Sequence, residues 1–415
     1  MTVPRLIAIG LVYILTTVAW FTLGGTLVAR SGESDGRLSQ EVAQLWGGRH
    51  EQLSPAVWWE RPRPVTEDVT EKNATGADVM RKVTRTEFER VPVAIARSRV
   101  ETRLDLDQRR KGLLWYDTYA VDFRATYVVS NPDVVPREVF VQFSFPSSTG
   151  LYDNFKFQLA GREVPAGNDL SAGVVASARL APGETVQAEV AYRSRGLGDW
   201  SYVLAREGVA QVRDFQLTMR TDFAAIDFPP GSLSPTSKTP AAGGWTLDWK
   251  FESLVTGQRI GMDTPNRLNP GPLAAEITFF APVSLLFFMT VMVVIGVLSG
   301  RSLHPMNYFF LAAAFFAFHL LLAYLVDHLD IHASFAVAAV VSVFLVTTYL
   351  RVVAGLRTAL VEAGLAQAIY LVLFSYAFFF KGYTGLSVTV GAIVTLFVLM
   401  QLTARVDWAA ALRSR

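Results

Sequence analysis

The chain has 415 residues, of which 51% are hydrophobic, and its formal net charge is only +2 at pH 7. This near balance, without a basic patch, argues against nucleic acid as a partner. The sequence contains no cysteine, which excludes disulfides, iron–sulfur clusters, thiolate zinc sites and cysteine nucleophiles. An exported domain of this chain must therefore be stabilised by its hydrophobic core.

The first apolar segment runs from Leu6 to about Val28 and carries no charge. It is long enough to cross a bilayer core of roughly 30 Å. It is also longer than a typical signal-peptide core, and no clear small-x-small cleavage site adjoins it. We therefore predict an uncleaved transmembrane anchor at residues 1–29. The small residues Ala29 and Ser31 leave a cleaved signal peptide as the alternative.

The middle of the chain reads as a polar, extracytoplasmic region. Residues 30–114 form a charged, mixed segment that predicts no definite secondary structure. From Trp115 the hydrophobic pattern has a period of two, with Pro, Gly and Asn turns between short segments, which is typical of an antiparallel β-sandwich. We predict a β-rich domain and its linker over residues 115–275, and leave open whether residues 30–114 belong to it. The strand candidates are 119–129, 139–145, 155–160, 173–180, 185–193, 200–204, 211–220 and 245–252.

The last third of the chain is divided into apolar segments by short polar breaks. Because the backbone must satisfy its hydrogen bonds internally in lipid, these segments predict helices. We expect a five-helix transmembrane domain over residues 276–404 and a cytoplasmic tail at 405–415. The fold class is thus a membrane protein with one N-terminal helix, about five C-terminal helices and a mainly antiparallel β-sandwich outside the membrane. The five helical segments are 277–298, 306–326, 333–350, 365–380 and 385–403.

The basic residues predict the orientation, because cytoplasmic loops carry an excess of Lys and Arg. With the N-terminus inside, the short outside loops contain only one lysine, Lys381. We therefore predict that both termini are cytoplasmic and that residues 30–275 are periplasmic. The arginines that this arrangement places inside are Arg5, Arg301, Arg351, Arg357, Arg405, Arg413 and Arg415.

Several short motifs mark the ends of the predicted helices. The third begins His304-Pro305-Met306-Asn307-Tyr308 and ends Leu325-Val326-Asp327-His328-Leu329. The last exits through Thr403-Ala404-Arg405-Val406-Asp407-Trp408, and Trp46-Gly47-Gly48 follows the first. In these motifs and in its layout the chain resembles the CreD family of bacterial inner-membrane proteins.

The chain departs from the family pattern in two places. The family's Pro-Val-Asp-x-Tyr element corresponds to Met262-Asp263-Thr264-Pro265-Asn266, without a tyrosine, and Ser54 precedes Pro55 where the family has glycine. The chain is therefore identified as a divergent member. The resemblance implies a role in cell-envelope integrity and envelope-stress regulation in the inner membrane, without catalysis and without a cofactor. It implies membrane lipids and an envelope or membrane protein as partners.

Four of the five histidines lie between residues 304 and 332. His319 falls within the third helix, where an ionisable residue is a functional hypothesis by default. The alternative is a neutral imidazole that bonds a neighbouring helix. His304 either caps the helix or meets lipid headgroups. The candidate functional cluster consists of His304, Tyr308, His319, Asp327, His328, Asp330 and His332.

The segment from Asp327 to His332 has two interpretations. If it is helical, His328 and His332 share one face, and Asp327 and Asp330 share another. These residue types bind zinc or another divalent ion, although no His-Glu-x-x-His motif is present. The alternative is a solvated loop with a helix cap and a local salt bridge. We assign neither catalytic nor metal-ligating residues to the chain.

Two further motifs lie in the outer region. Trp58-Trp59 either forms a contact surface or is buried in the sandwich. The stretch Gly196-Leu197-Gly198-Asp199-Trp200-Ser201-Tyr202 predicts a turn before an aromatic strand rather than a phosphate site, since no strand–helix unit follows it.

The sequence leads to one main functional hypothesis and two alternatives. The main hypothesis is a non-enzymatic envelope-integrity protein that binds partners through its periplasmic β domain. The first alternative is a channel or transporter-like component, which requires a polar path through the helices. The second is an envelope-modifying enzyme, which requires titratable groups to converge near Asp327 to His332.

Overall fold

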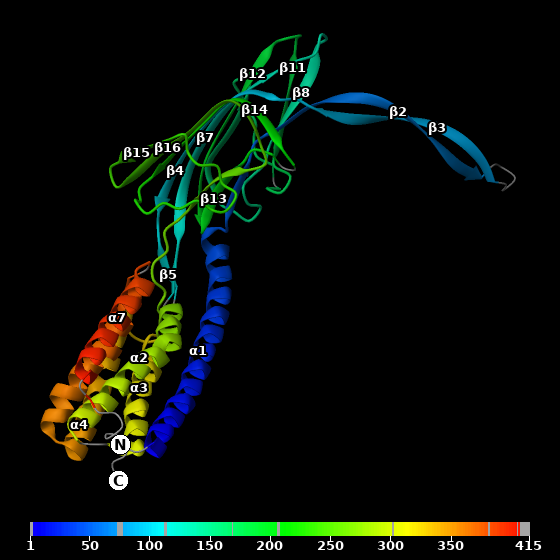
Figure 1. Cartoon of the computed structure of the whole chain (residues 1–415). Helices are drawn as coiled ribbons and strands as arrows, with labels where there is room; N and C mark the ends of the chain where they lie inside the picture. The colour runs from blue at the N-terminus through cyan, green and yellow to red at the C-terminus, as the bar shows by residue number, and fades with distance from the viewer. Residues whose placement is uncertain are drawn as a thin grey trace. The chain divides into compact units, whose positions relative to one another are not determined.

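A computed structural model describes residues 3–72, 78–111, 114–167, 169–205, 208–300, 303–380, 382–404 and 406. The chain divides into two compact units (Figure 1). The membrane unit comprises residues 1–38, 112–114 and 268–415, and the β unit comprises residues 39–111 and 115–267. Several residues used above lie outside the described part of the chain: Arg301, Lys381, Arg405, Asp407, Trp408, Arg413 and Arg415.

The β unit is built from four sheets that are mainly antiparallel, as predicted. The eight-stranded sheet has the order β10 (Arg162–Glu163), β9 (Tyr152–Leu159), β12 (Thr185–Leu197), β7 (Thr118–Ser130), β4 (Ile95–Leu106), β14 (Ala210–Thr221), β16 (Gly244–Thr256) and β15 (Ser237–Ala241). The four-stranded sheet has the order β11 (Val174–Leu180), β8 (Arg137–Phe143), β2 (Ala56–Lys72) and β3 (Asp78–Pro92). The smaller sheets are β1 (His50–Leu53), β13 (Asp199–Val203) and β17 (Arg259–Asp263), and β5 (Arg109–Lys111) with β6 (Leu114–Tyr116).

The eight-, four- and three-stranded sheets share one hydrophobic core, which explains the alternation of apolar and polar residues in the sequence. Phe123 and Trp249 come from the eight-stranded sheet, Phe143 from the four-stranded sheet, and Trp200 and Met262 from the three-stranded sheet. Two pairings are parallel, β4 with β14 and β1 with β13. The strands β1 to β4 come from residues for which the sequence predicted no definite structure, so much of that segment is β-sheet.

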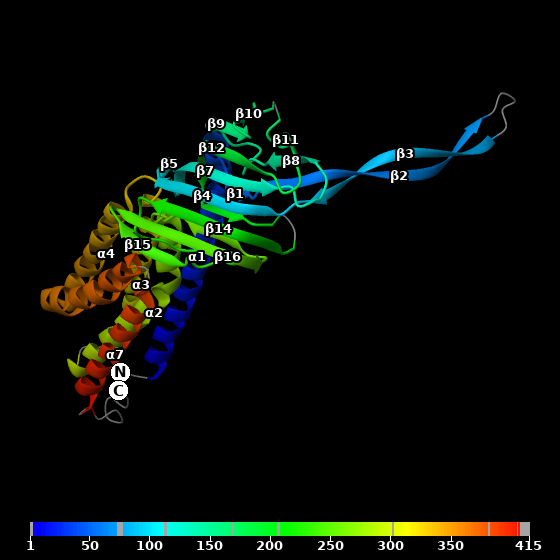
Figure 2. The same cartoon turned by 90° about the horizontal axis from the view of Figure 1, so that it is seen from above.

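The strands β2 and β3 form a long ribbon that leaves the rest of the β unit (Figures 1 and 2). They pair with each other from Trp58 opposite Pro92 to Lys72 opposite Asp78. Strand β8 accompanies β2 only from Ala56 to Trp59. We call residues 60–72 and 78–90 the β2–β3 arm.

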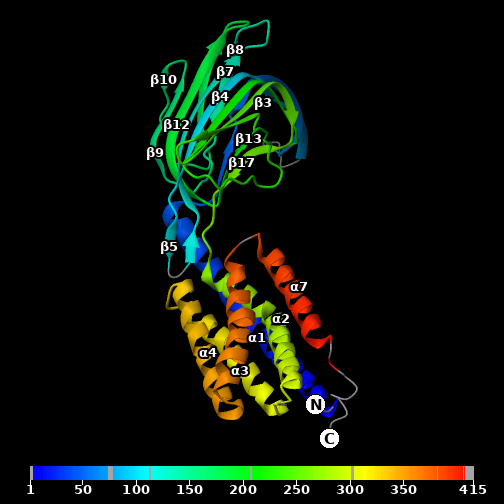
Figure 3. The same cartoon turned by 60° about the vertical axis from the view of Figure 1, so that its left-hand side comes forward.

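The membrane unit contains the six helices of sufficient length and apolar character to cross a membrane, in agreement with the prediction (Figure 3). The fifth of them combines two π-helical stretches, η1 (Thr358–Ala363) and η2 (Ala368–Leu373), with α5 (Gly364–Gln367), α6 (Phe374–Tyr376) and the 3₁₀ turn η3 (Ala377–Phe379). The others are α1 (Val3–Trp46), α2 (Pro270–Leu298), α3 (Pro305–Leu325), α4 (Ile331–Ala354) and α7 (Thr384–Thr403).

Several helix boundaries differ from the predicted ones, three of them by seven residues or more. Helix α1 continues beyond residue 29 to Trp46, and the fifth helix begins at Thr358 rather than at residue 365. Helix α2 begins at Pro270, where proline fits the first helical position. Helix α1 continues through a polar segment that contains Arg30, Glu33 and Arg37, because a hydrophobic run marks the part that suits lipid, whereas backbone hydrogen bonding determines where a helix ends.

Candidate functional sites

The loop between α3 and α4 does not gather its titratable residues into one site. Residues 326–329 form a turn and bend rather than a helix, so the condition under which His328 and His332 would share a helix face is not met. The reason is Asp330, whose side chain accepts hydrogen bonds from the backbone N–H groups of His332 (3.0 Å) and Ala333 (3.4 Å). This N-cap starts α4 at Ile331. Among the described residues, no group of three or more His, Asp or Glu side chains is arranged to hold a metal.

Asp327 is engaged by the first helix instead. Arg30 places its Nη2 atom 3.2 Å from Asp327 Oδ2 and donates from the same atom to the carbonyl oxygen of Ala323 (2.6 Å). Its guanidinium also lies over the ring of Tyr324, 5.2 Å from the centroid. Arg30 therefore ties α1 to the end of α3. His328 is exposed, and His332 stacks on Phe379 with ring centroids 4.9 Å apart.

The other three candidates lie along α3. His304 caps the helix, because its Nδ1 accepts a hydrogen bond from the Met306 N–H at 3.2 Å. Tyr308 is buried in the core of the membrane unit. His319 is also buried, and its Nδ1 lies 3.0 Å from the Phe315 carbonyl, which requires the proton on Nδ1.

Where α1 contacts α3, one buried hydrogen-bond donor and one buried acceptor have no partner among the described residues. Trp20 of α1 packs edge-on against His319, with centroids 5.6 Å apart. The indole Nε1–H of Trp20 and the Nε2 atom of His319 are both buried and unpaired. One donates and the other accepts, so the two groups are chemically complementary.

A second polar network joins α3, α4 and the fifth helix, and the sequence did not single it out as a site. Ser342 donates to the Ala314 carbonyl (2.7 Å) and accepts from Gln367 Nε2 (2.8 Å). Gln367 lies between the two π-helical stretches, and its buried Oε1 has no partner in the described part of the chain. Such stretches are frequent at functional sites. These buried side chains bond to neighbouring helices, and do not line an open polar path.

An acidic pocket of about 450 Å³ lies in the β unit. Its walls include Arg49, which directly follows the Trp46-Gly47-Gly48 motif, the turn at Gly198, and Asp263 to Asn266. The ladder between β13 and β17 sets Asp199 opposite Asp263. The charged and polar residues that line the pocket are Arg49, Asp117, Asp199, Asp227, Asp263, Thr264 and Asn266.

Hydrogen bonds fix the walls of this pocket. The backbone N–H of Thr264 donates to the Gly198 carbonyl (3.1 Å) and its hydroxyl donates to the Asp117 carbonyl (3.1 Å), so Thr264 joins two loops. Arg49 Nε lies 3.2 Å from Asp199 Oδ1, and the Asn266 amide, oriented with nitrogen inward, lies 3.1 Å from Asp117 Oδ1. One arginine thus faces four carboxylates, which gives the pocket a net negative charge and favours cationic ligands.

The pKa values of two of these carboxyl groups reflect the crowding. Burial, the largest cause, and Asp199 raise the pKa of Asp117 above its usual 3.8, while Arg49 opposes the shift. Burial, followed by repulsion from Asp199 and Asp227, raises the pKa of Asp263. The sequence did not predict a shared site for these carboxylates, because they are dispersed along the chain. Asp199 and Asp263 lie in two of the stretches noted above, but nothing in the sequence relates one stretch to the other.

Next to the pocket, His50 and Ser194 are both buried, each with 1% of its surface exposed. The Ser194 Oγ atom lies 3.3 Å from His50 Nε2, and His50 Nδ1 has no partner among the described residues. Burial lowers the pKa of His50 from 6.5 to about 4, so the ring is neutral at pH 7. A neutral, enclosed imidazole of this kind is a core residue of the β unit.

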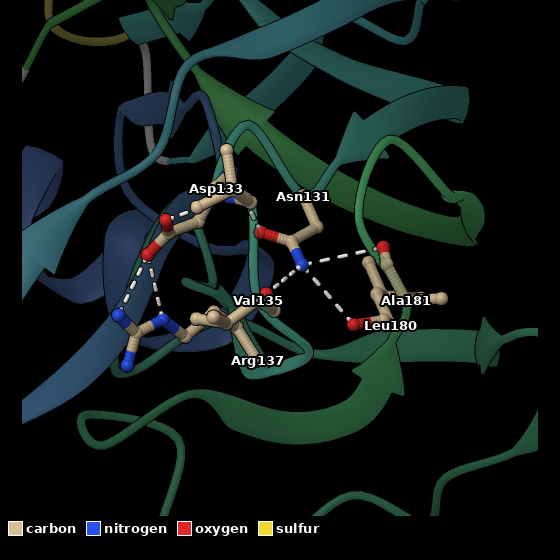
Figure 4. Close-up of polar contacts among 7 residues, drawn as sticks. Asn131, Asp133, Val135, Arg137, Leu180 and Ala181 are labelled. Carbon is tan, nitrogen blue, oxygen red and sulfur yellow. Dashed lines mark hydrogen bonds and ion pairs between the residues drawn. The ribbon is translucent and has the colours of Figure 1, made fainter.

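The root of the β2–β3 arm is fixed by aromatic and ionic contacts. Trp58 is buried and stacks on Phe140, so burial is the correct interpretation for this tryptophan. Trp59 lies under the guanidinium of Arg137, which is 3.9 Å from its ring centroid. Arg137 is in turn held by Asp133, 2.6 Å away (Figure 4).

The turn that carries Asp133 is itself clamped. The buried Asn131 side chain donates to the carbonyl oxygens of Val135, Leu180 and Ala181 at 2.9 to 3.2 Å (Figure 4). Contacts therefore connect Asn131 through Asp133 and Arg137 to Trp59 at the base of the arm.

Comparisons with solved structures give only distant likenesses. A protein provisionally described as nutrient-binding, from Legionella pneumophila, is 10% identical, with 48% of this chain and 74% of that chain covered and a TM-score of 0.30. An M1 zinc metallopeptidase from Deinococcus radiodurans is 13% identical, with 42% of each chain covered and a TM-score of 0.27. With identity and superposition this low, neither bears on the function. No curated protein matches the chain significantly.

The family comparison extends over almost the whole chain. The model of the family described as "Inner membrane protein CreD" matches residues 1–409. The match includes the helix-end motifs, the β unit and the helical block, and agrees with the six apolar helices. The chain therefore belongs to the CreD family and is a multi-pass inner-membrane protein of the bacterial envelope.

Proposed function

We propose that this protein acts in envelope integrity and the envelope-stress response by binding an envelope or membrane protein through its periplasmic β unit, without catalysis. Its helices contact membrane lipids and hold the β unit at the outer face of the membrane. Both termini are cytoplasmic in this proposal, because that orientation places the arginine-bearing short loops inside.

One observation carries the proposal: the β2–β3 arm is a two-stranded ribbon with which, in its described part, no other strand of the chain pairs. A two-stranded ribbon alone in water is at best marginally stable. Met80 and Phe88 on it are 76% and 63% exposed, although both are large apolar residues. Exposed apolar side chains on an open sheet edge favour a protein-binding surface.

The two alternatives receive less support from the described residues. A channel or transporter needs a polar path, whereas the buried Ser342 and Gln367 are bonded to each other and His319 to its own helix. An enzyme with a site near Asp327 needs convergent titratable groups. Asp327 is instead paired with Arg30, and Asp330 caps a helix.

The proposal is tested with a variant that lacks the arm. Because Trp59 lies opposite Val91 at a hydrogen-bonded position of the ladder, residues 60–90 can be replaced by Asn-Gly, which closes a two-residue hairpin without changing the register. After crosslinking in cells, we expect the wild-type protein to co-purify with a protein partner and the armless variant to lose it.

The matched control is Val255→Asp, which changes an apolar side chain that is 65% exposed on β16, elsewhere on the β unit. This variant should retain the partner. The proposal is wrong if the armless protein, present in the membrane at the wild-type level, recovers the same proteins as the wild type, counting a differently tagged copy of this chain among them.

A further inference from the structure

The two edges of the β2–β3 arm differ in their ability to pair with another strand. Pro62 and Pro64 of β2 lie opposite Phe88 and Thr86 of β3. Because proline has no N–H, these positions are the non-hydrogen-bonded pairs of the ladder, in which backbone groups point to the outer edges. The outer edge of β2 therefore lacks a donor at two successive outward positions, which is a common way to protect an edge.

The outer edge of β3 has no such protection. By the same alternation, its even-numbered residues direct their N–H and C=O groups outward. The hydrogen bond from the Val93 N–H to the Val57 carbonyl (2.8 Å) agrees, because it places the odd-numbered residues on the inner side. No proline interrupts β3 between Met80 and Arg90, and the exposed Met80 and Phe88 lie on one face of it.

We propose that the outer edge of β3 pairs antiparallel with the same edge of a second copy of this chain, with Thr84 opposite Thr84. This inference rests on the proposed function and names the protein that binds the arm. The pairing is isologous, so every contact occurs twice. In this register Met80 of each copy lies opposite Phe88 of the other, and the exposed apolar side chains of both arms cover each other.

Charge selects this register over its neighbours. A register centred on Arg85 sets that arginine opposite its own copy, and one centred on Lys82 does the same for the lysine. Like charges directly opposite each other destabilise a sheet. With Thr84 at the centre, Lys82 lies opposite Thr86. Arg85 then lies opposite Val83, so none of these cations opposes another.

The natural absence of cysteine gives a direct test in cells with the full-length protein. In the proposed ladder the two Thr84 positions are a hydrogen-bonded pair, with Cα atoms about 5.5 Å apart, which suits a disulfide. We expect Thr84→Cys to form a disulfide-linked dimer. The matched control is Thr66→Cys, since Thr66 is exposed and its Oγ1 lies 3.2 Å from that of Thr84 across the arm. It should remain monomeric.

Two more variants test the register and the edge. Differently tagged Met80→Cys and Phe88→Cys chains, when co-expressed, should form a mixed dimer in preference to either homodimer. Thr86→Pro removes an outward N–H in the same way as Pro62 and Pro64 and leaves the β2–β3 ladder intact. In the Thr84→Cys background it should reduce the dimer by about tenfold, which corresponds to about 1.4 kcal/mol.

The outcomes separate this inference from the proposed function. If the Thr84→Cys and Thr66→Cys chains crosslink equally at equal membrane abundance, the partner of the arm is not a second copy of this chain. If Thr84→Cys instead forms a mixed disulfide or adduct with a different protein, the arm binds a partner as proposed but not another copy. If the arm captures no chain and its removal changes no co-purification, both proposals fail.

Discussion

At the scale of single residues, His50 makes the clearest quantitative prediction. The folded protein keeps this histidine neutral, because burial lowers its pKa from 6.5 to about 4. Between these values the unfolded chain binds a proton that the folded chain does not. The free energy of unfolding therefore has its full value above pH 6.5 and decreases as the pH falls toward 4, by up to about 1.4 kcal/mol per pH unit.

The variant His50→Gln should remove this dependence and retain a side chain able to bond Ser194. The measurement is thermal unfolding of the full-length protein in detergent, followed by tryptophan fluorescence, at several pH values. The wild type and the variant are compared by how steeply the unfolding temperature changes with pH. The absolute stability is not compared, since the substitution also changes packing. An unchanged slope in the variant would assign the acid sensitivity to other groups.

The candidate residues show what a sequence reveals at this scale. The caps at His304 and Asp330 depend on backbone N–H groups two or three residues away, so they follow from local sequence. The ion pair between Arg30 and Asp327 joins helices that are distant in the chain. Nothing in the sequence relates these two residues, and the local salt bridge expected in the loop is replaced by a long-range one.

At the scale of elements, the hydrogen bonds of Ser342 predict a measurable loss. In Ser342→Ala the Ala314 carbonyl and the Gln367 amide lose their partner, both in the interior of the membrane unit. We expect a destabilisation of about 1 kcal/mol, within the range found for bonds between membrane helices. Thr348→Ala is the control, because its exposed hydroxyl bonds to a carbonyl of its own helix.

The measurement is an SDS titration of the purified protein, followed by circular dichroism. If the unpaired amide causes the loss, adding Gln367→Leu to Ser342→Ala should restore part of the stability, since it removes the group that is left unsatisfied. Equal stability of Ser342→Ala and the wild type would mean that the network contributes nothing to helix association.

The elements differ in how far the sequence predicted them. The strands of the core, such as β7 and β12, alternate apolar and polar residues because one face packs inward, and this pattern is visible. The β2–β3 arm has no buried face beyond its root, so its sequence lacks that alternation and predicted no structure. The polar end of α1 was missed for a related reason, since the hydrophobic signal ends before the helix does.

At the scale of the whole molecule, the testable quantity is the orientation in the membrane. The proposed arrangement places the β unit in the periplasm and the connection between α2 and α3 in the cytoplasm. The cysteine-free chain allows single thiols to report on both sides. Val134→Cys lies on the β unit, and Ser299→Cys lies at the end of α2, where the side chain is exposed.

A membrane-impermeant maleimide should label Val134→Cys in intact cells. It should label Ser299→Cys only after the cytoplasmic membrane has been permeabilised. The orientation and the partner-binding proposal are linked, because an arm in the cytoplasm would meet neither an envelope partner nor the oxidising conditions under which a Thr84→Cys dimer forms. Labelling of Ser299→Cys but not Val134→Cys in intact cells would therefore reverse the topology and exclude a periplasmic role for the β2–β3 arm.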